Sequence, residues 1–218
     1  MMSKPINMQK IFIIGLPRTG TTSVCAAMLE LGFHVAHTAY TDRSFIEAQV
    51  IADTPIFCDY QVLDHAYPNA KFIYLARSSD NWLPSIKQLL ARMHNNLIRE
   101  DGGFNPIIKR CYKSIFAPYN IENISSDEFL ALRYQEHKVA ADKYFQGREN
   151  DFLSIDISES TSYAQLLNFL AVNEGKSTEL SFKKLNVGGK VTAWKDIKSP
   201  LKVDSTNKGR VTKLPYLN

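Results

Sequence analysis

Residues 10–32, KIFIIGLPRTGTTSVCAAMLELG, contain the pattern that decides the fold. The apolar run at 11–14 predicts a short strand, and Gly15 and Gly20 bracket a turn in which the backbone can take positive φ. The residues that follow have apolar side chains at i, i+4 and i+7, which predicts a helix ending at Gly32. Backbone N–H groups at the start of such a helix point outward, and the helix dipole favours an anion there. The stretch therefore predicts a loop that binds phosphate.

This loop has the spacing Gly-x-x-x-x-Gly-Thr-Thr, which differs from the loop of nucleoside-triphosphate enzymes at one position. Those enzymes have a lysine directly after the second glycine, and this lysine reaches the outer phosphates. Here Thr21 occupies that position, and Arg18 is the only cation of the loop. The missing lysine disfavours ATP-dependent phosphoryl transfer and moves the positive charge into the loop itself.

The composition is ordinary for one globular domain spanning residues 1–218, with 44% apolar and 22% charged residues. A net charge of +4 suits a small anionic ligand and is too weak to indicate a nucleic acid partner. Three cysteines without Cys-x-x-Cys spacing indicate neither a disulfide framework nor a zinc site. The first residues lack the apolar stretch of a signal peptide, and no run reaches membrane-spanning length, so we expect a cytoplasmic protein.

Short strands alternate with helical patterns after the first helix. The predicted elements are a strand at 33–36, a helix at 44–52, a strand at 56–58 that ends at Asp59, a helix at 60–67 and a strand at 71–76. The last of these is a continuous apolar run, as in central parallel strands that are buried on both faces. The alternation indicates a doubly wound α/β fold.

Arg77 follows directly after the strand at 71–76, at the end where open α/β sheets bind ligands. We expect Asn81 to cap the next helix, because Pro84 then falls in the first turn, where its missing N–H costs nothing. Ser85 then ends that turn. An arginine at a strand end and a serine at the following helix start can bind the same phosphate.

Two segments in this order, LPRTGTT and KFIYLARSSDNWLPSIKQL, resemble the nucleotide-binding motifs of the sulfotransferases that use 3′-phosphoadenosine 5′-phosphosulfate (PAPS). The resemblance is strongest over residues 10–92 and points to the bacterial-type branch with a Gly-x-Pro-Arg-Thr-Gly-Thr loop. It implies an α/β fold of the P-loop NTPase-like type, a single domain with a parallel sheet of about five strands flanked by helices. Residues 10–92 would then form the nucleotide-binding core.

The resemblance also implies roles for single residues. The loop would bind the 5′-phosphosulfate, and Arg18 would neutralise charge on the bridging oxygen as the product 3′-phosphoadenosine 5′-phosphate (PAP) leaves. Arg77 and Ser85 would bind the 3′-phosphate. Since no triphosphate is bound, we expect no metal. The implied donor-binding residues are Pro17, Arg18, Thr19, Gly20, Thr21, Thr22, Arg77 and Ser85.

Residues 93–150 are predicted to be largely helical and to include the acceptor region. A capping-box sequence at 125–128 begins a long helix to about residue 145, and His137 lies on its apolar face, which indicates a buried structural histidine. A strand at 151–157 follows. Four aromatic residues before the long helix either line an acceptor pocket or pack an insertion: Phe104, Tyr112, Phe116 and Tyr119.

Residues 186–218 form a basic C-terminal segment that we expect to close over the nucleotide. A late loop of the sulfotransferases contains Lys-Gly or Lys-Gly-Arg. Here Lys208, Gly209 and Arg210 resemble that loop, and the stretch 188–190 (Gly-Gly-Lys) is the rival. A flexible basic tail is the alternative. Trp194 either stacks on the adenine or anchors the segment to the core.

An acceptor hydroxyl needs a general base, and three residues are candidates. Asp59 comes first, because it is expected at the end of a strand near the place where the cytosolic sulfotransferases have their histidine. His37 is next, since the ordinary pKa of histidine suits proton transfer near neutrality, and Asp53 is third. A helix-capping aspartate or a structural histidine is the alternative for each.

The sequence thus predicts an enzyme that moves a sulfuryl group from PAPS to a hydroxyl or amine of a small-molecule acceptor, whose identity is left open. One alternative is a small-molecule or nucleotide kinase that uses ATP, with Asp59 holding Mg²⁺. A second alternative is a protein that binds the nucleotide without catalysis. We expect no nucleic acid partner and no membrane span, and the oligomeric state is left open.

Overall fold

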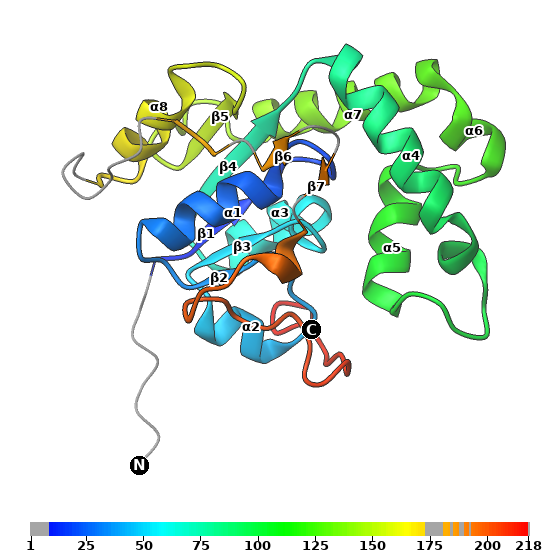
Figure 1. Cartoon of the computed structure of the whole chain (residues 1–218), viewed down its shortest axis with the longest axis horizontal. Coiled ribbons are helices and arrows are strands. Elements are labelled where there is room, and N and C mark those ends of the chain that lie inside the picture. Colours follow the sequence, from blue (N-terminus) through cyan, green and yellow to red (C-terminus); the bar gives the residue numbers. More distant parts are fainter. Residues whose placement is uncertain (1–8, 173–180, 184, 188–189, 192, 218) are drawn as a thin grey trace.

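A five-stranded parallel sheet forms the centre of the protein in the computed structural model, which describes residues 9–172, 181–183, 185–187, 190–191 and 193–217 (Figure 1). The strand order is β2-β3-β1-β4-β5, and every neighbouring pair is parallel. This confirms the predicted α/β fold. The strands are β1 (Ile11–Ile13), β2 (Val35–Ala36), β3 (Val50–Ala52), β4 (Lys71–Ala76) and β5 (Phe152–Asp156).

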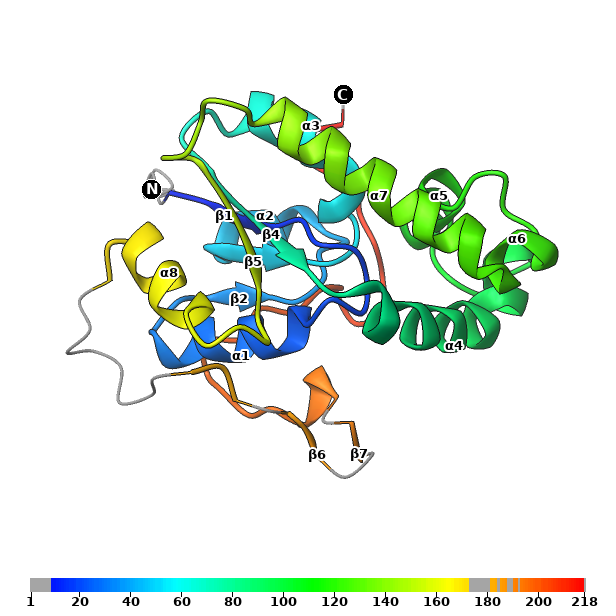
Figure 2. The ribbon, with the colours of Figure 1, turned by 90° about the horizontal axis from the view of Figure 1, so that it is seen from above.

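Helices cover both faces of this sheet (Figure 2). A small antiparallel pair, β6 (Asn186–Val187) and β7 (Lys190–Val191), and the 3₁₀ turn η2 (Trp194–Asp196) follow near the C-terminus. The α-helices are α1 (Thr21–Glu30), α2 (Asp42–Glu47), α3 (Ile56–Ala66), α4 (Ser79–Ile98), α5 (Pro106–Ile115), α6 (Ile121–Ser125), α7 (Asp127–Tyr144) and α8 (Ser162–Phe169).

The two faces of the sheet pack against different helices because side chains alternate along a strand. On β1, Ile11 and Ile13 join a buried cluster with α1 and α8, whereas Phe12 joins a cluster with α3 and the end of α7. All three residues are buried. Burial on both faces explains why the strands are continuous apolar runs instead of alternating ones.

Helices α4, α5 and α6, with the first half of α7, form a helical extension beside the carboxyl end of the sheet (Figure 2). A third buried cluster holds it together, with Trp82 and Ile86 of α4 packed against Tyr112, Phe116 and Leu130. The cluster also contains Leu16 of the predicted phosphate loop. The extension therefore packs directly on the loop.

Two elements predicted between β2 and β4 are wrong, the helix at 44–52 and the strand at 56–58. Residues 56–58 are not a strand: they begin α3, so Asp59 lies in the first turn of a helix. The third strand is instead β3, where the sequence predicts the end of a helix, and α2 ends before it at Glu47. Both segments are short apolar runs without periodicity, and only their burial between neighbouring strands decides between helix and strand.

Helix α4 begins three residues earlier than predicted. Ser78, and not Asn81, stands at its N-cap position, and the Asn81 amide donates to the Ser78 hydroxyl at 2.9 Å. Pro84 therefore lies inside the helix, beyond the first turn. Helix α7 likewise begins after Ser126, whose hydroxyl accepts from the backbone N–H of Phe129 at 3.2 Å. No helix in the described part of the chain has both the length and the apolar character needed to cross a bilayer.

Candidate functional site

The loop from Gly15 to Gly20 joins β1 to α1 and is held by neighbouring elements. The sequence suggested a positive φ at Gly15, but the structure does not show one there. Gly15 instead allows close approach, because a Cβ there would lie 2.7 Å from the Cβ of Leu75 on β4. The indole N–H of Trp82 donates to the Pro17 carbonyl at 2.9 Å. Elements β4 and α4 therefore fix the shape of the loop.

Two residues of the loop have left-handed backbone conformations, Arg18 with φ 74° and Gly20 with φ 104°. An arginine in this region is strained, and such strain persists only where the surroundings enforce it. Thr19 supports the turn between them, because its hydroxyl and its N–H both donate to the Leu16 carbonyl, at 2.7 and 3.3 Å. No side chain caps the N-terminus of α1, and its first turn carries no acidic residue. The helix end is left available to an anion.

The structure brings Arg18, Arg77 and Ser85 together, as the sequence predicts for donor-binding residues. The Arg18 Nε donates to the Ser85 hydroxyl at 2.8 Å, and Arg77 Nη1 donates to the Arg18 carbonyl at 2.6 Å. This contact follows from the strand order, since β1 and β4 are neighbours and their carboxyl ends meet at one edge. Neither guanidinium forms an ion pair within the described residues.

Burial lowers the pKa of Arg18, and the nearby cations Arg92 and Arg77 lower it further, although Tyr112 and Asp53 act in the opposite direction. A positive charge is thus concentrated where it is only partly solvated. A bound anion offsets both the loss of solvation and the repulsion between the guanidinium groups, because it adds an opposite charge to a site of reduced dielectric.

A cavity of about 280 Å³ opens over the loop and is called here the phosphate-loop cavity. Two of the three candidate bases, His37 and Asp53, line it. The other lining residues are Pro17, Arg18, Gly20, Thr21, Thr22, Ser23, Arg77, Ser85, Leu89, Tyr112 and Leu185. The cavity therefore combines the predicted phosphate-binding groups with titratable side chains.

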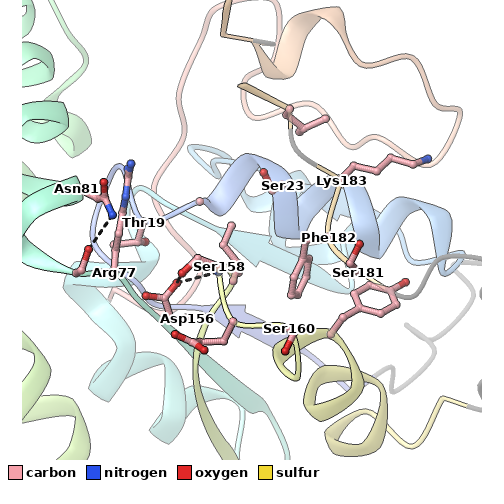
Figure 3. Close-up of a pocket in the computed structure, with 16 residues that line it drawn as sticks. Thr19, Ser23, Arg77, Asn81, Asp156, Ser158, Ser160, Ser181, Phe182 and Lys183 are labelled. Carbon is pink, nitrogen blue, oxygen red and sulfur yellow. Dashed lines mark hydrogen bonds between the residues drawn. The ribbon is translucent and has the colours of Figure 1, made fainter. Parts of the chain in front are cut away.

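A second cavity of about 470 Å³, the adjacent cavity, lies on the other side of Arg77 and is shown in Figure 3. Arg77, Gly20 and Ser23 line both cavities, so the two spaces meet at the loop. The adjacent cavity continues along the segment that follows β5, where Asp156 accepts from the N–H and the hydroxyl of Ser158 at 2.9 and 2.7 Å. No motif of the sequence points to this segment, which lies at the end of the predicted strand at 151–157.

Aromatic side chains lie at the far end of the adjacent cavity. Phe182 and Tyr163 meet edge to face, with their ring centroids 5.1 Å apart, and both line the cavity. Figure 3 shows Phe182 beside the cavity, with Arg77 and Asn81 at the opposite end. The cavity thus has Arg77 at the end next to the loop, and aromatic rings together with Lys183 at the end away from it.

His37 follows β2 and lies beside the first turn of α1. Its Nε2 is 3.0 Å from the Thr22 hydroxyl. Burial lowers its pKa, an effect that Asp53 opposes and Lys202 reinforces. The imidazole is therefore neutral near pH 7 and can accept a proton. Trp194 stacks at a tilt on His37 with a centroid distance of 5.2 Å and lies under Lys202, so this ring anchors the C-terminal segment to the core and does not line either cavity.

Asp59, the first candidate base, does not line the phosphate-loop cavity or the adjacent cavity. Its carboxylate is 6% exposed and accepts two hydrogen bonds from Arg110, at 2.8 and 2.6 Å. The Tyr216 hydroxyl donates a third at 2.9 Å. A carboxylate held by three donors ties α3 to α5 and to the C-terminal segment, and it has no access to the loop.

The predicted closing residues also lie outside both cavities. Lys208, Gly209 and Arg210 form an exposed turn closed by a bridge between Asn207 and Arg210, and none of them lines either cavity. The segment after this turn pairs with Tyr40, whose carbonyl accepts from Thr212. The rival residues 188–189 lie outside the described residues.

The predicted acceptor aromatics separate into two groups. Tyr112 lines the phosphate-loop cavity, with its phenol buried beside Arg18 and Asp53. Phe116, Phe104 and Tyr119 pack in the same third buried cluster as Tyr112, but they do not line the phosphate-loop cavity. His137 is buried as predicted: its Nε2 lies 2.8 Å from the Phe57 carbonyl.

Comparison with known proteins agrees with this geometry. The model of the sulfotransferase domain family matches residues 10–44 and 38–191, which is most of the chain. The "Ava biosynthesis cluster protein M" of Aspergillus versicolor is 30% identical over 111 residues, which cover 37% of this chain and 43% of that protein. The chain therefore aligns with less than half of the length of this relative.

Proposed function

Because the chain belongs to the sulfotransferase domain family, we propose that it transfers a sulfuryl group from PAPS to a hydroxyl or amine of a small-molecule acceptor and releases PAP. The observation that carries this proposal is the convergence of Arg18, Arg77 and Ser85 on the uncapped start of α1, without a lysine at position 21. The name of the Aspergillus relative, a biosynthesis cluster protein, supports a small molecule as acceptor.

The two cavities suggest how the donor lies. We propose that the 5′-phosphosulfate binds over the loop, where Thr21 and Thr22 add N–H groups and hydroxyls from the first turn of α1. The 3′-phosphate binds Arg77 and Ser85, and the nucleoside extends into the adjacent cavity toward Phe182. A cavity with an arginine at one end and aromatic rings at the other has the chemistry that a nucleotide requires.

Arg18 and His37 are the proposed catalytic residues. Sulfuryl transfer breaks the bond between sulfur and the bridging oxygen of PAPS, and Arg18 stabilises the charge that collects on that oxygen. His37 accepts the proton of the attacking acceptor group, because it is neutral and lines the same cavity. Asp53 lies close enough to raise the pKa of His37 and would stabilise the imidazolium that forms.

A kinase receives less support. The Mg²⁺-holding aspartate of that alternative, Asp59, is bound by Arg110 and Tyr216 away from the loop. We therefore expect a donor without a triphosphate. We also expect the reaction to take place in the cytoplasm, where cysteines are kept as thiols unless an oxidant such as a small disulfide acts on them.

Calorimetric titration of the purified protein with PAP, with ATP plus Mg²⁺ and with 5′-AMP tests the proposal. We expect PAP to bind without a metal and more tightly than 5′-AMP, because only PAP has a 3′-phosphate for Arg77. Preference for ATP with Mg²⁺ would refute the sulfotransferase proposal. Screening of acceptors with PAPS then separates an enzyme from a protein that only binds the nucleotide.

A further inference from the structure

Helices α3 and α5 meet through three successive residue pairs that run in opposite directions along the two helices. Phe57 packs edge to face on Tyr112 with centroids 5.9 Å apart. One residue further, Cys58 and Cys111 lie opposite each other, near enough that each shifts the pKa of the other. After that, Asp59 pairs with Arg110. A cysteine pair is thus held in register between an aromatic contact and a double hydrogen bond.

The two thiols differ in acidity. The pKa of Cys58 is lowered, first by the hydrogen bond from Cys111, whereas its burial and Asp59 act in the opposite direction. Arg110 adds to the lowering and places Nη1 3.7 Å from the Cys58 sulfur. The pKa of Cys111 is raised, first by its hydrogen bond to Cys58 and then by burial. Cys58 is therefore the more acidic thiol of the pair, and the more acidic thiol is the one suited to attack while the other resolves.

The more acidic thiol is also the more accessible one. Cys58 is partly exposed and lines a third cavity of about 340 Å³, bordered by Tyr60, Ser114 and His137, whereas Cys111 is fully buried. This cavity shares no lining residue with the two cavities at the phosphate loop. A small reagent can reach Cys58 from it without entering the proposed donor site.

We propose that Cys58 and Cys111 form a reversible oxidation site for small disulfides that enter through this third cavity. The Cys58 thiolate attacks one sulfur of the small disulfide, a mixed disulfide forms, and one thiolate leaves. Cys111 then loses its proton and attacks the Cys58 sulfur, which releases the second small thiol. The two protein sulfurs are oxidised and the small disulfide is reduced to two thiols.

Closure of the pair needs little movement. The Phe57–Tyr112 and Asp59–Arg110 contacts on either side already hold the two cysteines opposite each other, and a disulfide would bring their sulfur atoms to about 2.05 Å. The bond would tie the start of α3 to α5 next to Tyr112, which lines the phosphate-loop cavity. Oxidation therefore restrains one wall of the proposed active site.

The experiment treats the reduced, desalted full chain with 2-hydroxyethyl disulfide, then follows the intact mass and, after denaturation at low pH, the thiols left for alkylation. We expect a product lighter by two hydrogen atoms, with Cys58 and Cys111 protected, Cys25 alkylated, and full reversal by dithiothreitol. Cys111→Ser should accumulate the mixed disulfide at Cys58. Cys25→Ser, a matched change of a buried cysteine on α1, should close the same bond as the natural chain.

Three results would overturn the proposal: all three thiols still reactive after treatment, a mixed disulfide at Cys58 that never resolves in the natural chain, or a bond that includes Cys25. Peptide mapping of the natural chain decides among these without any variant, so a Cys111→Ser protein that fails to fold does not weaken the test. None of these readouts depends on sulfuryl transfer.

Discussion

Replacement of Arg77 by alanine tests the proposed donor site most directly. Arg77 is half-buried at the meeting point of the two cavities, and its Nη1 donates to the Arg18 carbonyl at 2.6 Å. A hydrogen bond to a charged group contributes about 1.5–3 kcal/mol to binding. Because the Arg77 side chain is partly exposed, we expect its contribution not to exceed that range. Because each 1.4 kcal/mol is about tenfold in affinity, Arg77→Ala should weaken PAP binding by about 10- to 150-fold.

The assay is calorimetric titration with two ligands, PAP and 5′-AMP. If Arg77 binds the 3′-phosphate, the substitution weakens binding of PAP. The affinity for 5′-AMP stays within about twofold, because 5′-AMP has no 3′-phosphate and its 5′-phosphate binds at a separate place on the loop. Arg99→Ala is the matched control. Arg99 is exposed, pairs with Asp101 at 3.0 Å and lines neither cavity at the loop.

Two outcomes would refute this reasoning. Equal losses for PAP and 5′-AMP would mean that Arg77 acts by holding the loop through the Arg18 carbonyl and does not bind the 3′-phosphate. Unchanged affinity for both ligands would mean that the nucleotide does not bind beside Arg77 at all. Melting temperatures of the two variants exclude a general loss of structure as the cause.

Three further predictions concern titrating groups. NMR titration should place the pKa of His37 below 6.5 in the free protein, and PAP should raise it, because a nearby anion stabilises the imidazolium; a PAP-independent pKa would argue against His37 in the donor cavity. Asp59→Asn should cost about 1–3 kcal/mol of unfolding free energy in urea, through the loss of its charged contact with Arg110, and leave PAP affinity intact; lost sulfuryl transfer at unchanged stability would restore Asp59 as the base. Burial lowers the pKa of His137 below its ordinary 6.5, so the unfolded chain binds more protons and unfolding free energy should fall as pH drops from about 6.5 to 5. His137→Gln should reduce the dependence of unfolding free energy on pH. If urea titrations at about pH 6.5 and 5 show the same dependence in the variant and the natural chain, His137 is not its source.

The predicted and observed elements agree best where the sequence pattern is long or chemically specific. The strand at 71–76 matches β4 at both ends, because a continuous apolar run bounded by polar residues has one stable location in a sheet. The segments at 44–52 and 56–58 were predicted wrongly, since three or four apolar residues suit a helix and a strand equally. Their conformation depends on which neighbours cover them.

The same division applies to the candidate site. The sequence predicted that Arg77 and Ser85 bind one phosphate beside the loop, and the structure brings both to Arg18, because a loop after one strand and an arginine after another meet when the strands are adjacent and parallel. The Ser85 hydroxyl accepts from Arg18, and Arg77 donates to the Arg18 carbonyl. The order of the three candidate bases could not be obtained in this way. Asp59 is separated from the loop by its place in α3, and the residues after β5 enter the site only through the position of β5 beside β4.

The sequence by itself determined the class of fold, and it predicts the anion-binding loop and the roles of Arg77 and Ser85, because each depends on local backbone requirements and short spacings. Only the tertiary structure decided that His37 and Asp53 share the loop cavity, that Asp59 is held by Arg110, and that Cys58 meets Cys111. These contacts join side chains from segments with no fixed relation along the chain. Their distances are set by the order of the strands and by the packing of α3 against α5, which no local pattern encodes.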